Sequence, residues 1–231
     1  MFNILFHELP GAVFDTLFMT ISASFMAFII GLPLGLLLYT TAHGSLFSSR
    51  LINRPLSIII DSVRAIPFII LAFYLLPVTR IVVGSGVGIF SVIFVLTISA
   101  IPFYARIAEL SFKTVEYSLV EAVRSMGASR FQIVRYVLIP EALSSLITGF
   151  TVMVISLISA TSLAGYLGGG GLGDMAIRYG YQRYNTSIMT IVIIFLIILN
   201  ILFNGLVTEL RRNLIERSIK KLKSLFLSLQ S

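Results

Sequence analysis

The sequence has no cysteine, only two histidines and few charged side chains. Without cysteine it has no disulfide framework and no thiolate metal site. His7 and His43 lie far apart, so no catalytic or metal site built on histidine is expected. Charged residues make up 12% of the chain, against roughly 25% in soluble domains. Because so few polar side chains cannot cover a water-exposed surface, lipid is the natural alternative solvent.

Long apolar runs dominate the rest of the chain. Asp, Glu, Lys and Arg are all absent from residues 16–49, 81–105, 142–173 and 184–208. Each run exceeds the ~20 residues that cross a bilayer core as a helix. A fifth stretch is interrupted by Asp61 and Arg64, which are three residues apart and so can pair on one helix face.

These runs predict an all-α integral membrane protein, because backbone groups in lipid need internal hydrogen-bond partners. No strand-like alternation marks the runs, which argues against a β-barrel. We predict one transmembrane domain over residues 1–231 with five spans, at about 14–41, 56–79, 87–110, 139–163 and 186–208.

Basic residues indicate the orientation of these spans. Thirteen of the seventeen Lys and Arg lie after spans 1 and 3 and in the C-terminal tail, and three lie after spans 2 and 4. The positive-inside rule therefore places the N-terminus outside and the C-terminus in the cytoplasm. The N-terminus has no basic region of its own, so no cleaved signal peptide is expected.

The net charge of +7 then reflects membrane topology, and no nucleic-acid partner is expected. The basic tail after Arg211 is expected to anchor at anionic membrane lipid. Contact with a regulatory module of a partner protein is the alternative.

The connector at 116–140 is the most informative segment. Ser118 and Glu121 form an S-x-x-E capping box, which predicts a helix from about Leu119 to Met126 that ends at a C′ glycine, Gly127. Ser129 begins a second capping box, S-x-x-Q, and a helix toward span 4. Leu119, Val120, Val123 and Met126 would form an apolar stripe on the first helix. So short a helix needs a surface to pack on, either a partner protein or this chain's own helix ends.

The residues of this connector resemble the signature of permease subunits of bacterial binding-protein-dependent ABC importers. In that signature Glu-Ala-Ala is followed after three residues by Gly, and after nine more by Ile-x-Leu-Pro. Here the positions hold Glu121, Ala122, Val123, Gly127, Val137, Leu138, Ile139 and Pro140. Three apolar replacements, Val123, Val137 and Ile139, depart from the pattern, and the spacing is intact.

Four further segments are similar to the methionine importer permease family: Val63–Gly84, Ile101–Arg106, Met126–Leu143 and Gly165–Asn185. This resemblance implies a type I ABC importer permease with a cytoplasmic coupling helix, working as a homodimer in the bacterial inner membrane. It also implies two cytoplasmic ATPase subunits, which hold ATP and Mg, and an external methionine-binding lipoprotein that delivers D- or L-methionine. The chain itself is expected to be no enzyme and to bind no cofactor, and it lacks a nucleotide-binding P-loop.

The resemblance assigns the contact with the ATPase to the coupling loop, with a set of expected residues: Glu121, Ala122, Val123, Met126, Gly127 and Pro140. Glu121 has two candidate roles, as a helix cap or as an ion-pair partner of the ATPase. Gly127→Asp is expected to abolish uptake, because left-handed geometry disfavours most residues and the charge would enter a packed joint.

Two further sets of residues are candidates for the transport path. Ser156, Ser159, Thr161 and Ser162 put hydroxyls in span 4, where they could line the substrate path or act as ordinary helix contacts. Gly168, Gly169, Gly170 and Gly171 predict a flexible outer turn, which is either a plain loop or a gate or docking point. In span 1, Gly31, Pro33 and Gly35 are interpreted as ordinary membrane-helix composition, with a kink or close helix contact as the alternative.

Three other functions compete with this interpretation. A permease for another amino acid or a small osmolyte is the main one. A secondary transporter would show an inverted repeat, and none is visible. A membrane enzyme would need convergent acids or histidines inside the spans.

Overall fold

The apolar runs form helices in the computed structural model, which describes residues 2–229 and, for side chains, residues 7–209 and 212. Every regular element within residues 2–229 is helical. The elements are α1 (Phe2–Thr41), α2 (Arg50–Ala65), α3 (Phe68–Val83), α4 (Ile89–Lys113), α5 (Tyr117–Ser125), α6 (Arg130–Ile133), η1 (Val134–Leu138), α7 (Ile139–Thr161), η2 (Ala164–Leu167), α8 (Gly171–Met175), η3 (Ala176–Tyr181) and α9 (Thr186–Leu229).

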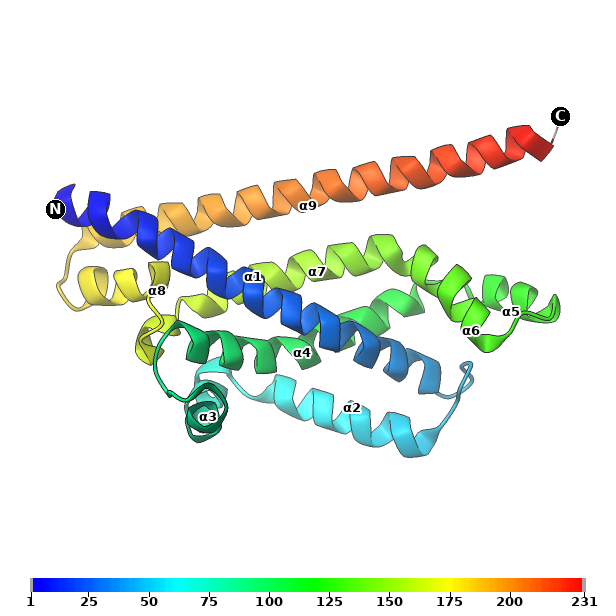
Figure 1. The fold of residues 1–231 in the computed structure, drawn as a ribbon, viewed down its shortest axis with the longest axis horizontal. Coiled ribbons are helices and arrows are strands. Elements are labelled where there is room, and N and C mark those ends of the chain that lie inside the picture. Colours follow the sequence, from blue (N-terminus) through cyan, green and yellow to red (C-terminus); the bar gives the residue numbers. More distant parts are fainter. Residues whose placement is uncertain (1, 230–231) are drawn as a thin grey trace.

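Four predicted spans are confirmed as single helical stretches. The segments long and apolar enough to cross a bilayer are His7–Thr41, Ile89–Lys113, Arg130–Thr161 and Thr186–Glu209. Figure 1 shows α1, α4, α7 and α9 running along the long axis of the molecule. Buried side chains from α1, α4 and α7 form the central core, in which Met19, Leu96 and Met153 are fully enclosed.

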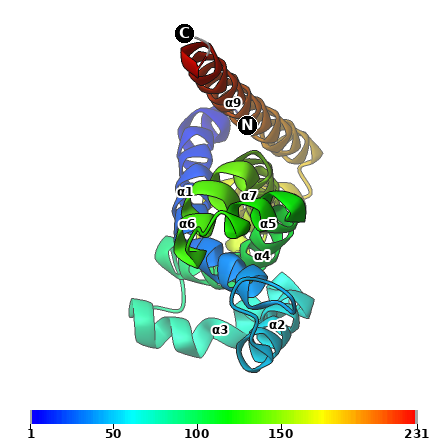
Figure 2. The same ribbon diagram turned by 90° about the vertical axis from the view of Figure 1, so that its right-hand side faces the viewer.

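The second predicted span is not one helix. The prediction of one continuous helix over 56–79 was therefore wrong. The chain forms α2 and α3, whose axes meet at 108°. Ile66 takes an extended ψ of 124°, because the ring of Pro67 disfavours helical geometry in the residue before it. Figure 2 shows α3 from the side, directed away from the body of the molecule. With the bent pair counted as one span, the described residues contain five.

Gly31 and Gly35 bring α1 close to α4, so their interpretation as ordinary composition was wrong. A Cβ atom at Gly31 would lie 3.0 Å from the carbonyl oxygen of Ile101, and one at Gly35 would lie 2.5 Å from that of Ala105. Small residues allow this approach, as is common between membrane helices. The helix α1 continues through Pro33 without interruption.

Different elements lie at the two ends of the molecule. The start of α1 and the short helix α8 lie at one end, and α5, α6 and the far end of α9 lie at the other (Figure 1). This arrangement agrees with an odd number of crossings between the termini. The predicted lipid anchor begins at Arg211, and apart from Arg212, which pairs with Glu209 at 2.7 Å, its side chains lie outside the described residues.

Candidate functional site

The loop that contains the signature forms a short helix, α5, closed by a glycine. The amide of Gly127 donates to the carbonyl of Arg124 at 3.0 Å, and the amide of Ala128 donates to that of Val123 at 3.4 Å. These two bonds form a Schellman motif, and Gly127 has the left-handed φ of +87° that this motif requires. The predicted C′ role of Gly127 is therefore confirmed.

The described residues form no packed joint around Gly127. A Cβ atom at Gly127 would meet nothing within 4 Å. The position is constrained by its backbone conformation and not by its neighbours. For Gly127→Asp, the expected left-handed geometry is therefore confirmed, the packed joint is absent from the described residues, and the effect on uptake stays a prediction.

The first predicted capping box was wrong, and the second is confirmed. The helix α5 begins at Tyr117 with Glu116 as its N-cap residue, and the Ser118 hydroxyl donates to the Glu116 carboxylate at 2.6 Å. Ser118 therefore lies inside the helix and cannot cap it. At Ser129, the backbone amide donates to the Gln132 side chain at 2.8 Å and the hydroxyl accepts from the Gln132 amide at 3.3 Å.

The chain stays helical through Pro140. The helical stretch is continuous from Arg130 to Thr161. The π-helical turn η1 precedes Pro140, and the amide of Ile139 bonds to the carbonyl of Val134. This wider turn accommodates the proline ring, which has no N–H and would collide with a carbonyl in a regular turn.

Only half of the predicted apolar stripe on α5 is covered by this chain. Val120 is buried and Val123 is half-buried, and both belong to a cluster with side chains of α4, α6 and η1. Leu119 and Met126 are exposed, Met126 to 77%. Ala122 is exposed as well. The helix thus packs on its own chain through one face and presents a mixed apolar and polar face to the outside.

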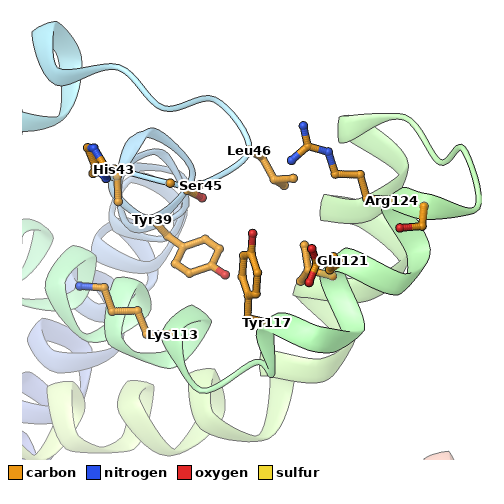
Figure 3. A pocket seen from close by; sticks show the side chains of 12 residues that line it. Tyr39, His43, Ser45, Leu46, Lys113, Tyr117, Glu121 and Arg124 are labelled. Carbon is orange, nitrogen blue, oxygen red and sulfur yellow. The ribbon is translucent and has the colours of Figure 1, made fainter.

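A groove of about 650 Å³ separates α5 from the end of α1 and the connector that follows it. Figure 3 shows Glu121 and Arg124 on one side of this groove, opposite Tyr39 and His43. Glu121 caps no helix and makes no ion pair within the described residues. Of its two predicted roles, the cap was wrong.

A charged cluster that the sequence reasoning missed joins α2 to α4. The predicted Asp61–Arg64 pair is confirmed at 3.3 Å. Arg106 adds contacts of 2.5 Å to Asp61 and to Glu109, and Lys113 reaches Glu109 at 2.7 Å. The Glu109 side chain is only 5% exposed, and its two cations compensate the burial of its charge. The spacing of Arg106, Glu109 and Lys113 was the available signal, because residues three and four apart share a helix face.

The glycine-rich run is packed and is not the flexible turn that was predicted. Gly169 and Gly171 are buried, and Gly168, Gly170 and Gly171 have positive φ values. The hydroxyl of Thr16 on α1 accepts the amide of Leu172 at 2.9 Å. The run therefore holds α8 against α1, and a role in gating or docking stays a prediction.

Polar contacts beside this run fasten the end of the molecule that contains the start of α1. Arg178 pairs with Asp174 at 2.5 Å, and the Tyr179 hydroxyl donates to Glu8 at 2.5 Å. The hydrogen bond to the Glu8 carboxylate raises the pKa of Tyr179. These contacts tie the segment before α9 to the start of α1.

The four hydroxyls predicted in span 4 do not share one environment. Ser156 and Ser159 are exposed, Ser162 is half-buried and Thr161 is buried. Thr161 donates to the carbonyl of Ile158 at 2.6 Å, while the hydroxyl of Ser156 has no partner within the described residues. Ser156 is therefore the member of the set whose hydroxyl proton is not already donated within the described residues.

No group of three or more His, Asp or Glu side chains in the described part of the chain could hold a metal ion. Each carboxylate of the charged cluster between α2 and α4 is instead paired with two basic side chains.

Comparisons with known proteins give one consistent result. Residues 31–216 match the family of binding-protein-dependent transport system inner membrane components. The probable D-methionine transport system permease protein MetI of Vibrio cholerae is 43% identical over 188 residues, which cover 81% of this chain and 84% of that protein. The methionine import system permease protein MetP of Bacillus subtilis is 38% identical over 215 residues, which cover 93% and 96%.

A solved structure gives the same fold. The inward-facing MetNI methionine ABC transporter in its CY5 native crystal form contains a chain with a TM-score of 0.87 and 40% identity. The match covers 89% of this chain and 95% of that one.

Proposed function

The chain belongs to the family of binding-protein-dependent transport system inner membrane components, and we propose that it is the permease subunit of an ATP-driven methionine importer. Two kinds of observation support methionine as the substrate. Relatives at 38% and 43% identity carry methionine in their names, and the MetNI transporter chain has the same fold over nearly its whole length.

The exposed face of α5 is the observation that carries the mechanism. Its inner face is attached to the ends of α4 and α6 through Val120, and its outer face presents Ala122 and Met126 to a partner. A motor protein that binds this face can move the attached helices as rigid bodies. Glu121 would make an ion pair with the partner, since it has none within the described residues.

The partners follow from this arrangement. ATP, with Mg, is bound and hydrolysed in two cytoplasmic ATPase subunits, so this chain is a non-catalytic transport subunit. A second copy of the chain completes the membrane pathway, and an extracytoplasmic binding protein delivers methionine. The distribution of basic residues supports a cytoplasmic α5 and C-terminus, with the N-terminus outside.

Reconstitution tests the proposal. The permease is assembled with its ATPase and its binding protein in proteoliposomes, and uptake of labelled methionine is measured with and without ATP. Uptake that requires ATP, and that unlabelled methionine suppresses more strongly than other amino acids or betaine, is expected. Uptake of another solute in preference to methionine would overturn the substrate, and uptake without ATP would overturn the coupling.

A variant pair tests the role of α5. Ala122→Arg places a long charged side chain on the exposed outer face and should abolish binding of the ATPase subunit. Ser187→Arg, at an exposed position near the outer end of α9, is the matched control and should bind normally. Equal ATPase binding by the two purified variants would show that α5 is not the docking helix.

A further inference from the structure

A second cavity lies where the broken span meets the core. It has a volume of about 280 Å³ and twelve lining residues, which come from the end of α2, the break, the start of α3, the middle of α4 and the C-terminal part of α7. Irregular backbone at membrane depth is tolerated where it is buried in protein or lines a cavity. The break at Ile66 and Pro67 fits this condition, because Ile66 forms part of the cavity wall.

The lining has an apolar floor. Leu71, Ala100, Met153 and Leu157 line the cavity and are each at most 5% exposed. Phe103 adds an aromatic ring that is half-buried. Such a floor accepts a flexible apolar side chain, and a thioether gains further from contact with an aromatic ring.

Polar groups lie among the more exposed lining residues. Of the twelve lining residues Arg64 alone carries a charge. One of its guanidinium nitrogens pairs at 3.3 Å with Asp61, which lies outside the lining. Ser156 presents a hydroxyl with no partner in the described residues. The Ser99 hydroxyl donates to the carbonyl of Leu96 at 2.8 Å, so its oxygen can still accept a hydrogen bond.

We propose that this cavity holds the transported amino acid during its passage, with the carboxylate toward Arg64, the ammonium toward the Ser99 and Ser156 oxygens, and the apolar side chain on the floor. Because the contact with Asp61 uses one guanidinium nitrogen, the remaining N–H groups of Arg64 can bind one further carboxylate. The lining contains no acid to pair with a cationic side chain. The site therefore selects zwitterionic amino acids with apolar side chains and rejects basic and acidic ones. This inference rests on the proposed function, since it takes the chain to be an amino-acid permease.

The test uses the complete transporter in proteoliposomes. Ser156→Phe should fill the cavity and lower methionine uptake about tenfold or more, because the ring occupies the ligand volume, while the purified complex keeps its ATPase subunits and still binds the external binding protein. Thr190→Phe is the control. It makes a change of similar size at an exposed position on α9, which does not line the cavity, and should transport normally.

The outcomes separate this inference from the proposed function. If the unmodified transporter does not take up methionine, the proposed function fails. If it does, and Ser156→Phe takes it up at the normal rate, the cavity assignment fails and the function stands.

A second measurement needs no variant. A diazirine analogue of methionine is photolysed with the unmodified complex, and labelled peptides of the permease are mapped by mass spectrometry. Labels on Phe103 or Met153 that methionine and leucine suppress, and that lysine and glutamate do not, are expected. Labelling only elsewhere in the permease, or suppression by lysine, would overturn the assignment.

Discussion

Gly35→Ala should destabilise the protein, although the same change in most helices is stabilising. The added Cβ atom would lie 2.5 Å from the carbonyl oxygen of Ala105 and 2.6 Å from the Cβ atom of Ala108. Neither atom can rotate away, because one is backbone and the other is fixed to it. Ordinary contact begins at 3.4 Å, so α1 and α4 would have to separate by roughly 1 Å, with loss of dispersion contacts along the seam.

The magnitude follows from two opposed effects. Overpacking of this kind costs about 1–3 kcal/mol, whereas replacing a glycine inside a helix by alanine gains about 0.5–1 kcal/mol. A net loss of about 1–2 kcal/mol is expected at Gly35. Gly205 on α9 is the matched control, since a Cβ atom there meets nothing within 4 Å. Gly205→Ala should therefore be neutral or slightly stabilising.

The assay is unfolding of the purified permease in mixed micelles with increasing sodium dodecyl sulfate, followed by circular dichroism. The midpoint for Gly35→Ala should fall below that of the unmodified protein, and the midpoint for Gly205→Ala should not. Equal midpoints for the two variants would refute the close approach of α1 and α4.

Three further pairs test the other interactions. Gly127→Val should lose about 1–2 kcal/mol of local stability in α5, measured by hydrogen exchange, whereas Gly127→Asn should retain most of it because asparagine tolerates positive φ; equal exchange in both would contradict the Schellman motif. Ser129→Ala should cost about 1 kcal/mol in the same assay, and Ser118→Ala, which caps nothing, should cost little; the reverse order would restore the first capping box. Arg106→Ala should cost about 2–4 kcal/mol in detergent unfolding because it removes a partner of the buried Glu109 carboxylate. Arg64→Ala removes only an exposed ion pair and should cost at most about 1 kcal/mol. Comparable losses would show that the cluster does not hold α2 to α4.

The spans, the end of the first connector helix and the start of the second could be predicted from sequence because their causes are local. A run of apolar residues longer than the bilayer needs no information from elsewhere in the chain. The Gly127 terminus and the Ser129 capping box likewise involve partners within five residues. At Ser118 the same local pattern failed, because the helix begins one residue earlier, at Tyr117, with Glu116 in the N-cap position.

The break in the second span could not be predicted by the same reasoning. Pro102 lies inside α4 and Pro33 inside α1 without ending either helix, whereas Pro67 ends α2. The difference depends on whether neighbouring helices or a cavity can accept the freed backbone groups, which is a property of the assembled structure.

The glycine run was misread for a related reason. Glycine permits both a mobile loop and a close approach, and the partners that decide between them, Asp15 and Thr16, lie more than 150 residues away in sequence. No local pattern carries that information.

The break divides the second span into parts with different attachments. Asn53 donates to the Leu38 carbonyl of α1 at 2.7 Å, and Asp61 pairs with Arg106 of α4, so α2 is fastened by polar contacts. Among the described residues, no side chain of α3 hydrogen-bonds or ion-pairs outside α3. A polar contact in lipid has no water to replace it when broken, whereas apolar surfaces can slide without leaving a group unsatisfied. Movement driven from α5 should therefore carry α1, α2 and α4 as one body and change the angle at Pro67, where the proposed substrate cavity lies.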